Sequence, residues 1–127
     1  MAKPRITKAE LQLLERLWEM KSASVREIQE SVPEQDRPAY TTVQTMMYRM
    51  EEKGAVKRSK KVGNAHVFEP VLPPSVVHGR FVRDLLDIFG GSAGMLMSHL
   101  VESGNLTLAD VREVERRLEE MEKEKNA

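Results

Sequence analysis

Apolar residues recur at helical spacing in two stretches near the start of the chain, and a capping pair opens each of them. Thr7 with Glu10 has the spacing of a capping box, and Ser24 with Glu27 has the same spacing. Pro33 ends the second stretch because proline lacks the N–H that an α-helix needs. The pattern therefore predicts two short amphipathic helices. Their inward positions are Leu11, Leu14, Leu17 and Trp18 in the first and Val25, Ile28 and Val32 in the second.

A third amphipathic stretch is followed by a change of period. Residues 40–53 carry apolar side chains at i, i+3, i+4 and i+7, and Gly54 stands where a left-handed C-terminal residue is typical. After Gly54, β-branched and aromatic residues flank the turn dipeptide Gly63-Asn64, which predicts an antiparallel hairpin. Three short helices and a hairpin predict a mainly α winged helix-turn-helix domain over residues 1–74. The inward positions of the third helix are Val43, Met46, Met47 and Met50.

The second part of the chain, residues 75–127, returns to helical spacing that is broken by the runs GGSAG and SGN. This pattern predicts three helices, the last opened by the capping pair Thr107 and Asp110. Three helices of this size cannot bury so much apolar surface alone, so we expect a helical region that forms a homodimer. The expected interface positions are Val77, Phe81, Leu85, Ile88, Phe89, Met95, Leu96, Leu100, Val111, Val114 and Leu118.

The polar face of the third helix is unusual because its first charged residue is Arg49. Threonine and glutamine hydrogen-bond base edges, and a threonine methyl packs on thymine. A helix in the major groove reads bases mainly with its N-terminal half, where these residues lie. The alternative is an ordinary polar helix start, where threonine is common. We expect base recognition by Thr41, Thr42, Gln44, Thr45 and Tyr48.

Charge is distributed unevenly although the whole chain has a net charge of +0. Residues 1–74 hold 13 Lys/Arg and 10 Asp/Glu, whereas residues 75–127 hold 7 and 10. Residues 53–61 contain five cations and no acid. Such a run is usually a solvated face, but beside a recognition helix it favours contact with a phosphate backbone. The expected phosphate and wing contacts are Arg49, Lys57, Arg58, Lys60, Lys61 and Asn64.

Several other classes of protein are disfavoured. The chain has no cysteine, which excludes disulfides and thiolate metal sites. No apolar run approaches the roughly 18 residues of a membrane span, and no signal-peptide core follows the first charges, so we expect no membrane insertion and a cytoplasmic location. His99 and Glu102 have the spacing of two metal ligands, but nothing near them completes a site. We expect no metal and no cofactor.

Enzyme chemistry has no support in the sequence. There is no Gly-x-Ser-x-Gly elbow, and the cluster of glycines at 90–94 lacks the lysine of a phosphate-binding loop. A helix break explains these glycines. The competing interpretation is a winged helix used for protein contact, with its basic hairpin on an acidic partner.

The residues themselves resemble a known family. The run YTTVQTMMYRMEEKG (Tyr40 to Gly54) with Val56 and Arg58, and then VGNAHVFEP (Val62 to Pro70), is similar to the penicillinase and methicillin-resistance repressors, the BlaI/MecI family. The run ITKAELQLLERLW resembles the first helix of that family, and FVRDLLDIFGGSAGMLMSHLVES resembles its dimerisation region. The resemblance covers nearly the whole chain.

This resemblance implies a homodimeric winged-helix repressor that binds pseudo-palindromic operators with TACA/TGTA-like half-sites. It also implies a functional link to a membrane-bound, β-lactam-sensing protease system that triggers cleavage in the C-terminal region. The best-known members are cleaved at an Asn-Phe bond, where this chain has His99 and Leu100. That pair marks the expected cleavage region.

Overall fold

The computed structural model describes residues 5–126, which divide into two compact units between Arg80 and Phe81. Residues 1–4, on which part of the expectation about a signal peptide rests, lie outside the described residues. The division falls inside helix α4 (Pro74–Ile88). The sequence instead predicts a boundary between residues 74 and 75, at the start of this helix, and that boundary stays a prediction.

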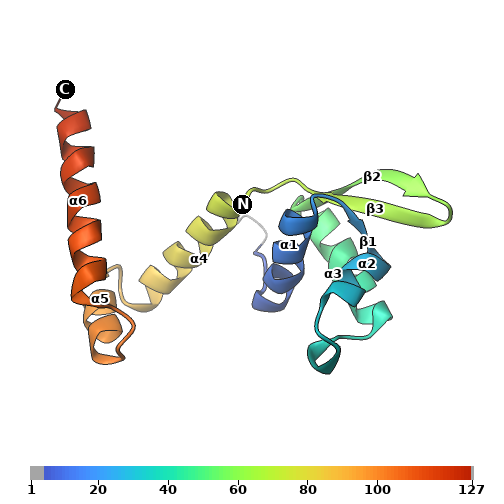
Figure 1. The fold of residues 1–127 in the computed structure, drawn as a ribbon, viewed down its shortest axis with the longest axis horizontal. Helices are drawn as coiled ribbons and strands as arrows, with labels where there is room; N and C mark the ends of the chain where they lie inside the picture. The colour runs from blue at the N-terminus through green and yellow to red at the C-terminus, as the bar shows by residue number, and fades with distance from the viewer. Residues whose placement is uncertain (1–4, 127) are drawn as a thin grey trace. The chain divides into compact units, whose positions relative to one another are not determined.

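The N-terminal unit has the element order of a winged helix-turn-helix domain, as the sequence predicts (Figure 1). Three helices come first, and a hairpin then extends beyond them. The elements are α1 (Lys8–Met20), β1 (Ala23–Ser24), α2 (Val25–Ser31), the 3-10 helix η1 (Glu34–Asp36), α3 (Tyr40–Glu52), β2 (Val56–Val62) and β3 (Ala65–Pro70).

Local hydrogen bonds explain where α1 and α2 begin. Both predicted capping boxes are present, with Thr7 and Glu10 at α1 and Ser24 and Glu27 at α2. Each box satisfies backbone N–H groups that an uncapped helix start leaves without partners.

The end of α2 is held by arginine side chains. Arg37 donates from Nη2 to the Glu30 carbonyl at 2.9 Å and from Nε to the Val32 carbonyl at 3.0 Å. Arg16 of α1 donates to the Ser31 carbonyl at 2.7 Å. These bonds satisfy carbonyls at the C-terminal end of α2 and fix the turn that leads to α3.

The hairpin belongs to a three-stranded antiparallel sheet with the order β1-β3-β2. Val62 pairs with Ala65 around the predicted turn, and the positive φ of 61° at Gly63 is what the first central residue of a type II′ turn needs. The register of β2 shifts between Arg58 and Lys60, so Ser59 is an extra residue in this strand. Strand β1 was not predicted from the sequence.

Side chains from all three helices and from β3 form the core of this unit. Leu14 and Leu17 of α1 and Phe68 of β3 are fully buried. Leu13 is also buried although it lies outside the predicted stripe, whereas Trp18 is only half-buried. The Trp18 indole Nε1 instead donates to the Leu72 carbonyl at 2.9 Å. The other fully buried side chains of the helices are Ile28, Val43, Met47 and Met50.

The C-terminal unit contains the end of α4, α5 (Ala93–Glu102) and α6 (Leu108–Lys125). Gly90 and Gly91 both have positive φ, which explains the break after α4. Thr107 and Asp110 form the predicted capping box of α6. No helix among the described residues is long and apolar enough to cross a membrane.

Candidate nucleic-acid interface

The exposed side of α3 carries the side chains that the sequence assigns to base recognition. Thr41, Thr42, Thr45 and Tyr48 are exposed and Gln44 is half-buried, whereas Val43, Met47 and Met50 face the core. We call Thr41, Thr42, Gln44, Thr45 and Tyr48 the reading face.

The start of α3 is open for contact with an anion. Its N-cap is Ala39, which has no side-chain hydrogen bond to the helix, and the first turn contains no acid. The N–H groups of the first turn therefore lack a side-chain acceptor. Backbone N–H groups at a helix start, together with the helix dipole, favour a phosphate oxygen.

The hydroxyl of Thr45 has a fixed orientation. Its Oγ1 donates to the Thr41 carbonyl at 2.9 Å, so its hydrogen is already used within the helix. Thr45 can therefore offer a base edge only oxygen lone pairs and a methyl group. A base amino group and a thymine methyl are the partners that match these groups.

The other two large polar side chains of the reading face bond to each other. Gln44 Nε2 donates to the Tyr48 hydroxyl oxygen at 3.2 Å. The Tyr48 ring lies 5.0 Å from the guanidinium carbon of Arg58, which comes from β2. The reading face is thus attached to the hairpin through an aromatic side chain.

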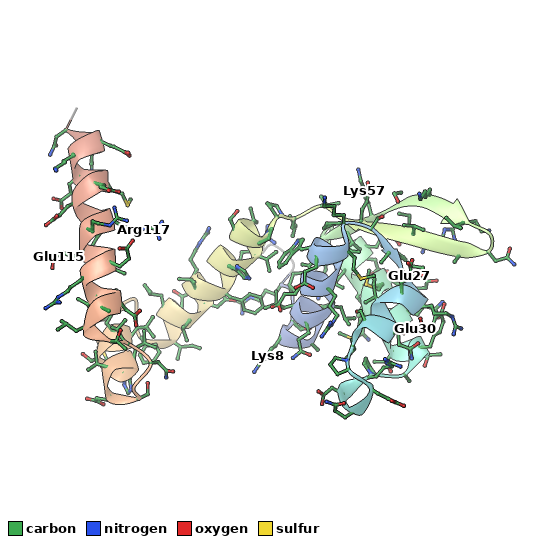
Figure 2. The ribbon with its side chains drawn as sticks, viewed as in Figure 1. Lys8, Glu27, Glu30, Lys57, Glu115 and Arg117 are labelled. Carbon is green, nitrogen blue, oxygen red and sulfur yellow. The ribbon has the colours of Figure 1, made fainter. Side chains whose placement is uncertain are left out.

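The cations of the hairpin fall into two groups. Lys57 lies 3.4 Å from Glu69, and the Arg58 Nε lies 2.9 Å from an oxygen of Glu51. The Lys57 side chain lies at the surface of β2 (Figure 2) and is 62% exposed. Lys60 and Lys61 are exposed and form no ion pair with any described residue.

Two further residues predicted to contact phosphate are also available. Arg49 is exposed on α3 and forms no ion pair within residues 5–126, and Asn64 is exposed at the tip of the hairpin. The structure therefore places every predicted residue of the DNA-binding surface on α3 or on the hairpin, but it leaves Arg58 paired with an acid.

One ion pair of this unit was not predicted. Lys53, at the end of α3, places its Nζ 2.6 Å from Oε1 of Glu10 in α1. Glu10 is only 3% exposed, and its Oε2 has no hydrogen-bond partner. Burial acts to raise the pKa of Glu10, but the hydrogen bonds from Lys53 and Thr7 and the Lys53 charge bring the pKa below its ordinary value.

The predicted interface residues differ in exposure. Val77 is 1% exposed and lies in the core of the N-terminal unit, so it is not available to a second chain. Phe81, Phe89, Leu96 and Leu100 are half-buried. The exposed members are Leu85, Ile88, Met95, Val111, Val114 and Leu118.

The expected cleavage region is helical. The peptide bond between His99 and Leu100 lies inside α5, and the Phe89 ring lies 5.2 Å from the His99 ring. The Leu100 carbonyl accepts from the N–H of Asn105 at 2.9 Å. Within the described part of the chain, no group of three or more histidine and acidic side chains is placed to hold a metal ion.

Comparison with known proteins gives a match along most of the chain. The family model described as penicillinase repressor matches residues 6–120. A curated relative, the penicillinase repressor of Bacillus licheniformis, is 25% identical over 118 residues, which span 92% of this chain and 91% of the relative.

Two solved structures are also similar. The DNA-binding domain of the repressor BlaI has a TM-score of 0.51 and 28% identity, with 58% of this chain and 89% of that domain covered. A mutant MarR from E. coli, complexed with operator DNA, has a TM-score of 0.51 and 18% identity, with 91% of this chain and 75% of that chain covered. At 18% identity, the similarity to MarR shows the fold alone.

Proposed function

Because this chain belongs to the penicillinase repressor family, whose members are DNA-binding transcriptional repressors, we propose that it binds a pseudo-palindromic operator as a homodimer. In this proposal α3 enters the major groove and the hairpin lies against the phosphate backbone. The repressor acts in the cytoplasm and needs no cofactor.

The exposed surface of α3 is the single observation that carries this proposal. The helix buries Val43, Met47 and Met50 and exposes uncharged hydroxyl groups over its first two turns, where the Gln44 side chain is half-buried. Short polar groups without charge can hydrogen-bond to base edges, and cations are common partners of phosphate oxygens. Exposed Arg49, Lys60 and Lys61 supply those cations nearby.

The exposed apolar residues of the C-terminal unit support the homodimer. Val111, Val114, Leu118 and Met121 form a stripe along α6 at spacings of 3, 4 and 3 residues, and each is between 37% and 63% exposed. A stripe with this spacing is a coiled-coil seam. Two copies related by a two-fold axis present two α3 helices to successive major grooves, so the preferred site has two-fold symmetry.

Release from DNA is the second part of the proposal. The resemblance to the family links the chain to a membrane-bound sensor protease, with cleavage at or near His99-Leu100. That bond lies within α5, so a protease gains access only when α5 opens locally. The pair differs from the Asn-Phe of the best-known members, and a chain with His99→Asn and Leu100→Phe together provides a direct comparison of cleavage rates.

Retention on immobilised duplex DNA at increasing salt tests DNA binding against the alternative, which is docking of the basic hairpin on an acidic protein. Each phosphate contact releases about 0.9 counterions from B-DNA, so a DNA-binding protein shows a steep linear fall of log K with log salt. We expect a slope of about −4 or steeper for a dimer with two or more contacts per chain. Weak retention with no dependence on duplex sequence would favour the acidic protein partner.

A further inference from the structure

The side chain of Arg58 makes contacts that differ from those of its neighbours in the basic run. Its guanidinium carbon lies 5.0 Å from the centre of the Tyr48 ring and 5.6 Å from the centre of the Phe68 ring. Its Nε lies 2.9 Å from the Glu51 carboxylate. One arginine of the hairpin therefore contacts α3 through both an aromatic ring and an acid.

These contacts reduce the ability of Arg58 to act as a phosphate ligand. Its Nε donates to the Glu51 carboxylate, and its guanidinium carbon lies over the Tyr48 and Phe68 rings. Lys60 and Lys61 follow the bulge at Ser59 and have no such partners among the described residues. The basic run thus contains cations with two different kinds of surroundings.

The contact with Tyr48 extends to the reading face. Phe68 is fully buried and fixes one side of the cluster, with its ring 6.4 Å from the Tyr48 ring. Tyr48 is 38% exposed, and its hydroxyl accepts from Gln44 Nε2 at 3.2 Å. A chain of contacts therefore runs from the core through Phe68, Arg58 and Tyr48 to the amide of Gln44.

The orientation of the Gln44 amide affects what it can recognise. With one N–H directed at Tyr48, the amide presents one remaining N–H and its carbonyl oxygen. Adenine offers N7 as acceptor and N6 as donor, and a glutamine amide binds both atoms at once. An amide that rotates freely can reverse its donor and acceptor and loses this selectivity.

We propose that Arg58 is a positioning residue for sequence recognition: it holds Tyr48, and through Tyr48 the Gln44 amide, in the orientation that reads a base. The inference rests on the proposed function, because it assumes that α3 contacts bases. Arginine is required rather than lysine, since a planar guanidinium stacks on a ring while it bonds to a carboxylate and a compact ammonium does not.

The test compares Arg58→Lys and Arg58→Met with Lys61→Met in the full chain. The DNA probes are the duplex that the wild-type protein enriches from a random pool and a scrambled duplex of the same composition. For each protein, we measure the ratio of the Kd for the scrambled duplex to the Kd for the enriched duplex. We also measure the slope of log K against log salt. Unfolding followed by the fluorescence of Trp18, the only tryptophan, identifies variants that fail to fold.

We expect both Arg58 variants to lower the Kd ratio about tenfold, the effect of losing one well-oriented base contact, with the salt slope unchanged. Lys61→Met should instead flatten the slope by about 0.9 per chain and leave the ratio unchanged. A flatter slope with an unchanged ratio in Arg58→Met would make Arg58 a phosphate ligand and overturn the inference. An unchanged ratio in Arg58→Lys would also overturn it.

A second measurement needs no DNA. The chain contains two tyrosines, and Arg26 lies 5.3 Å above the ring of the other one, Tyr40. In protein labelled with fluorotyrosine, Arg58→Lys should shift the fluorine resonance of Tyr48 and leave that of Tyr40 in place. An unshifted Tyr48 resonance would contradict the contact. A wild-type protein that enriches no duplex would refute the proposed function instead, so the two failures are distinct.

Discussion

The ammonium of Lys53 lies 2.6 Å from Oε1 of Glu10, and this ion pair joins the end of α3 to the first turn of α1. Glu10 also closes the capping box with Thr7, whose N–H donates to the same oxygen at 2.8 Å. A single buried carboxylate therefore caps one helix and anchors another. The helix that it anchors is the one we assign to DNA recognition.

The ion pair predicts an acid-sensitive stability. The pKa of Glu10 is lowered in the folded protein, so ionised Glu10 stabilises the fold. This stabilisation is fully present above the pKa that Glu10 has in the unfolded chain, and it is lost as pH falls through the pKa of Glu10 in the folded protein. Urea unfolding followed by Trp18 fluorescence between about pH 3 and pH 7 measures this. The free energy of unfolding of Glu10→Gln should fall less between about pH 7 and pH 3 than that of the wild-type protein. An identical pH profile in the variant would argue against Glu10 as a source of the acid sensitivity.

The two partners should respond unequally to substitution. Glu10→Gln leaves a lysine that can return to water, and we expect a loss of about 1–2 kcal/mol in the free energy of unfolding. Lys53→Met leaves a buried carboxylate without its counter-charge, which costs about 3–5 kcal/mol. Equal costs in the urea experiment would mean that Glu10 is hydrated after the lysine is removed.

Thr45 should discriminate between bases through its oxygen, its methyl group, or both. Replacing it with alanine should cost about 1–3 kcal/mol on the preferred duplex and much less on random DNA. Thr45→Val keeps a methyl group and Thr45→Ser keeps the hydroxyl, so the pair of variants separates the two contributions. Equal losses on specific and random duplexes would show that Thr45 does not contact a base.

Lys60 and Lys61 should contribute to affinity without contributing to sequence preference. Neutralising both should weaken binding to every duplex and reduce the salt slope by about 1.8 per chain, because each phosphate contact releases about 0.9 counterions. Equilibrium binding titrations at four or more salt concentrations give the slope. An unchanged slope would remove the hairpin from the interface.

The stripe on α6 predicts where a charge disrupts the dimer. Leu118 is 56% exposed in the single chain, so Leu118→Asp does not disturb a packed core within it. We expect this variant to sediment as a monomer and to lose operator affinity, because a carboxylate in an apolar seam is left without solvation. Arg112→Asp, at an exposed position on another side of α6, is the matched control and should remain dimeric. A dimer that persists in Leu118→Asp would locate the interface elsewhere.

The features predicted correctly are those that depend on local sequence. Three capping boxes, the Gly63-Asn64 turn and the glycine breaks are all encoded within a few residues, and the structure contains each of them. The family resemblance is confirmed by the match over residues 6–120. The order of helices and hairpin then fixes the fold class, because few folds have this order.

The features that were missed depend on contacts between distant residues. Strand β1 has two residues and is too short to show a period, so only its pairing with β3 identifies it. Glu10 is recognisable as a capping residue, but nothing near it in the sequence indicates Lys53. Arg58 looks like its lysine neighbours until the structure places it against Glu51 and Tyr48.

Selection of duplexes from a random pool by the full-length protein tests the central claim most directly. We predict enriched sites with two-fold related half-sites separated by about one turn of B-DNA, 10–10.5 bp, or a multiple of it. We further predict that Thr45→Val, selected in parallel, enriches a less restricted set of half-sites. Enriched sequences without two-fold symmetry, or no enrichment by the wild-type protein, would contradict a dimeric repressor that reads DNA through α3.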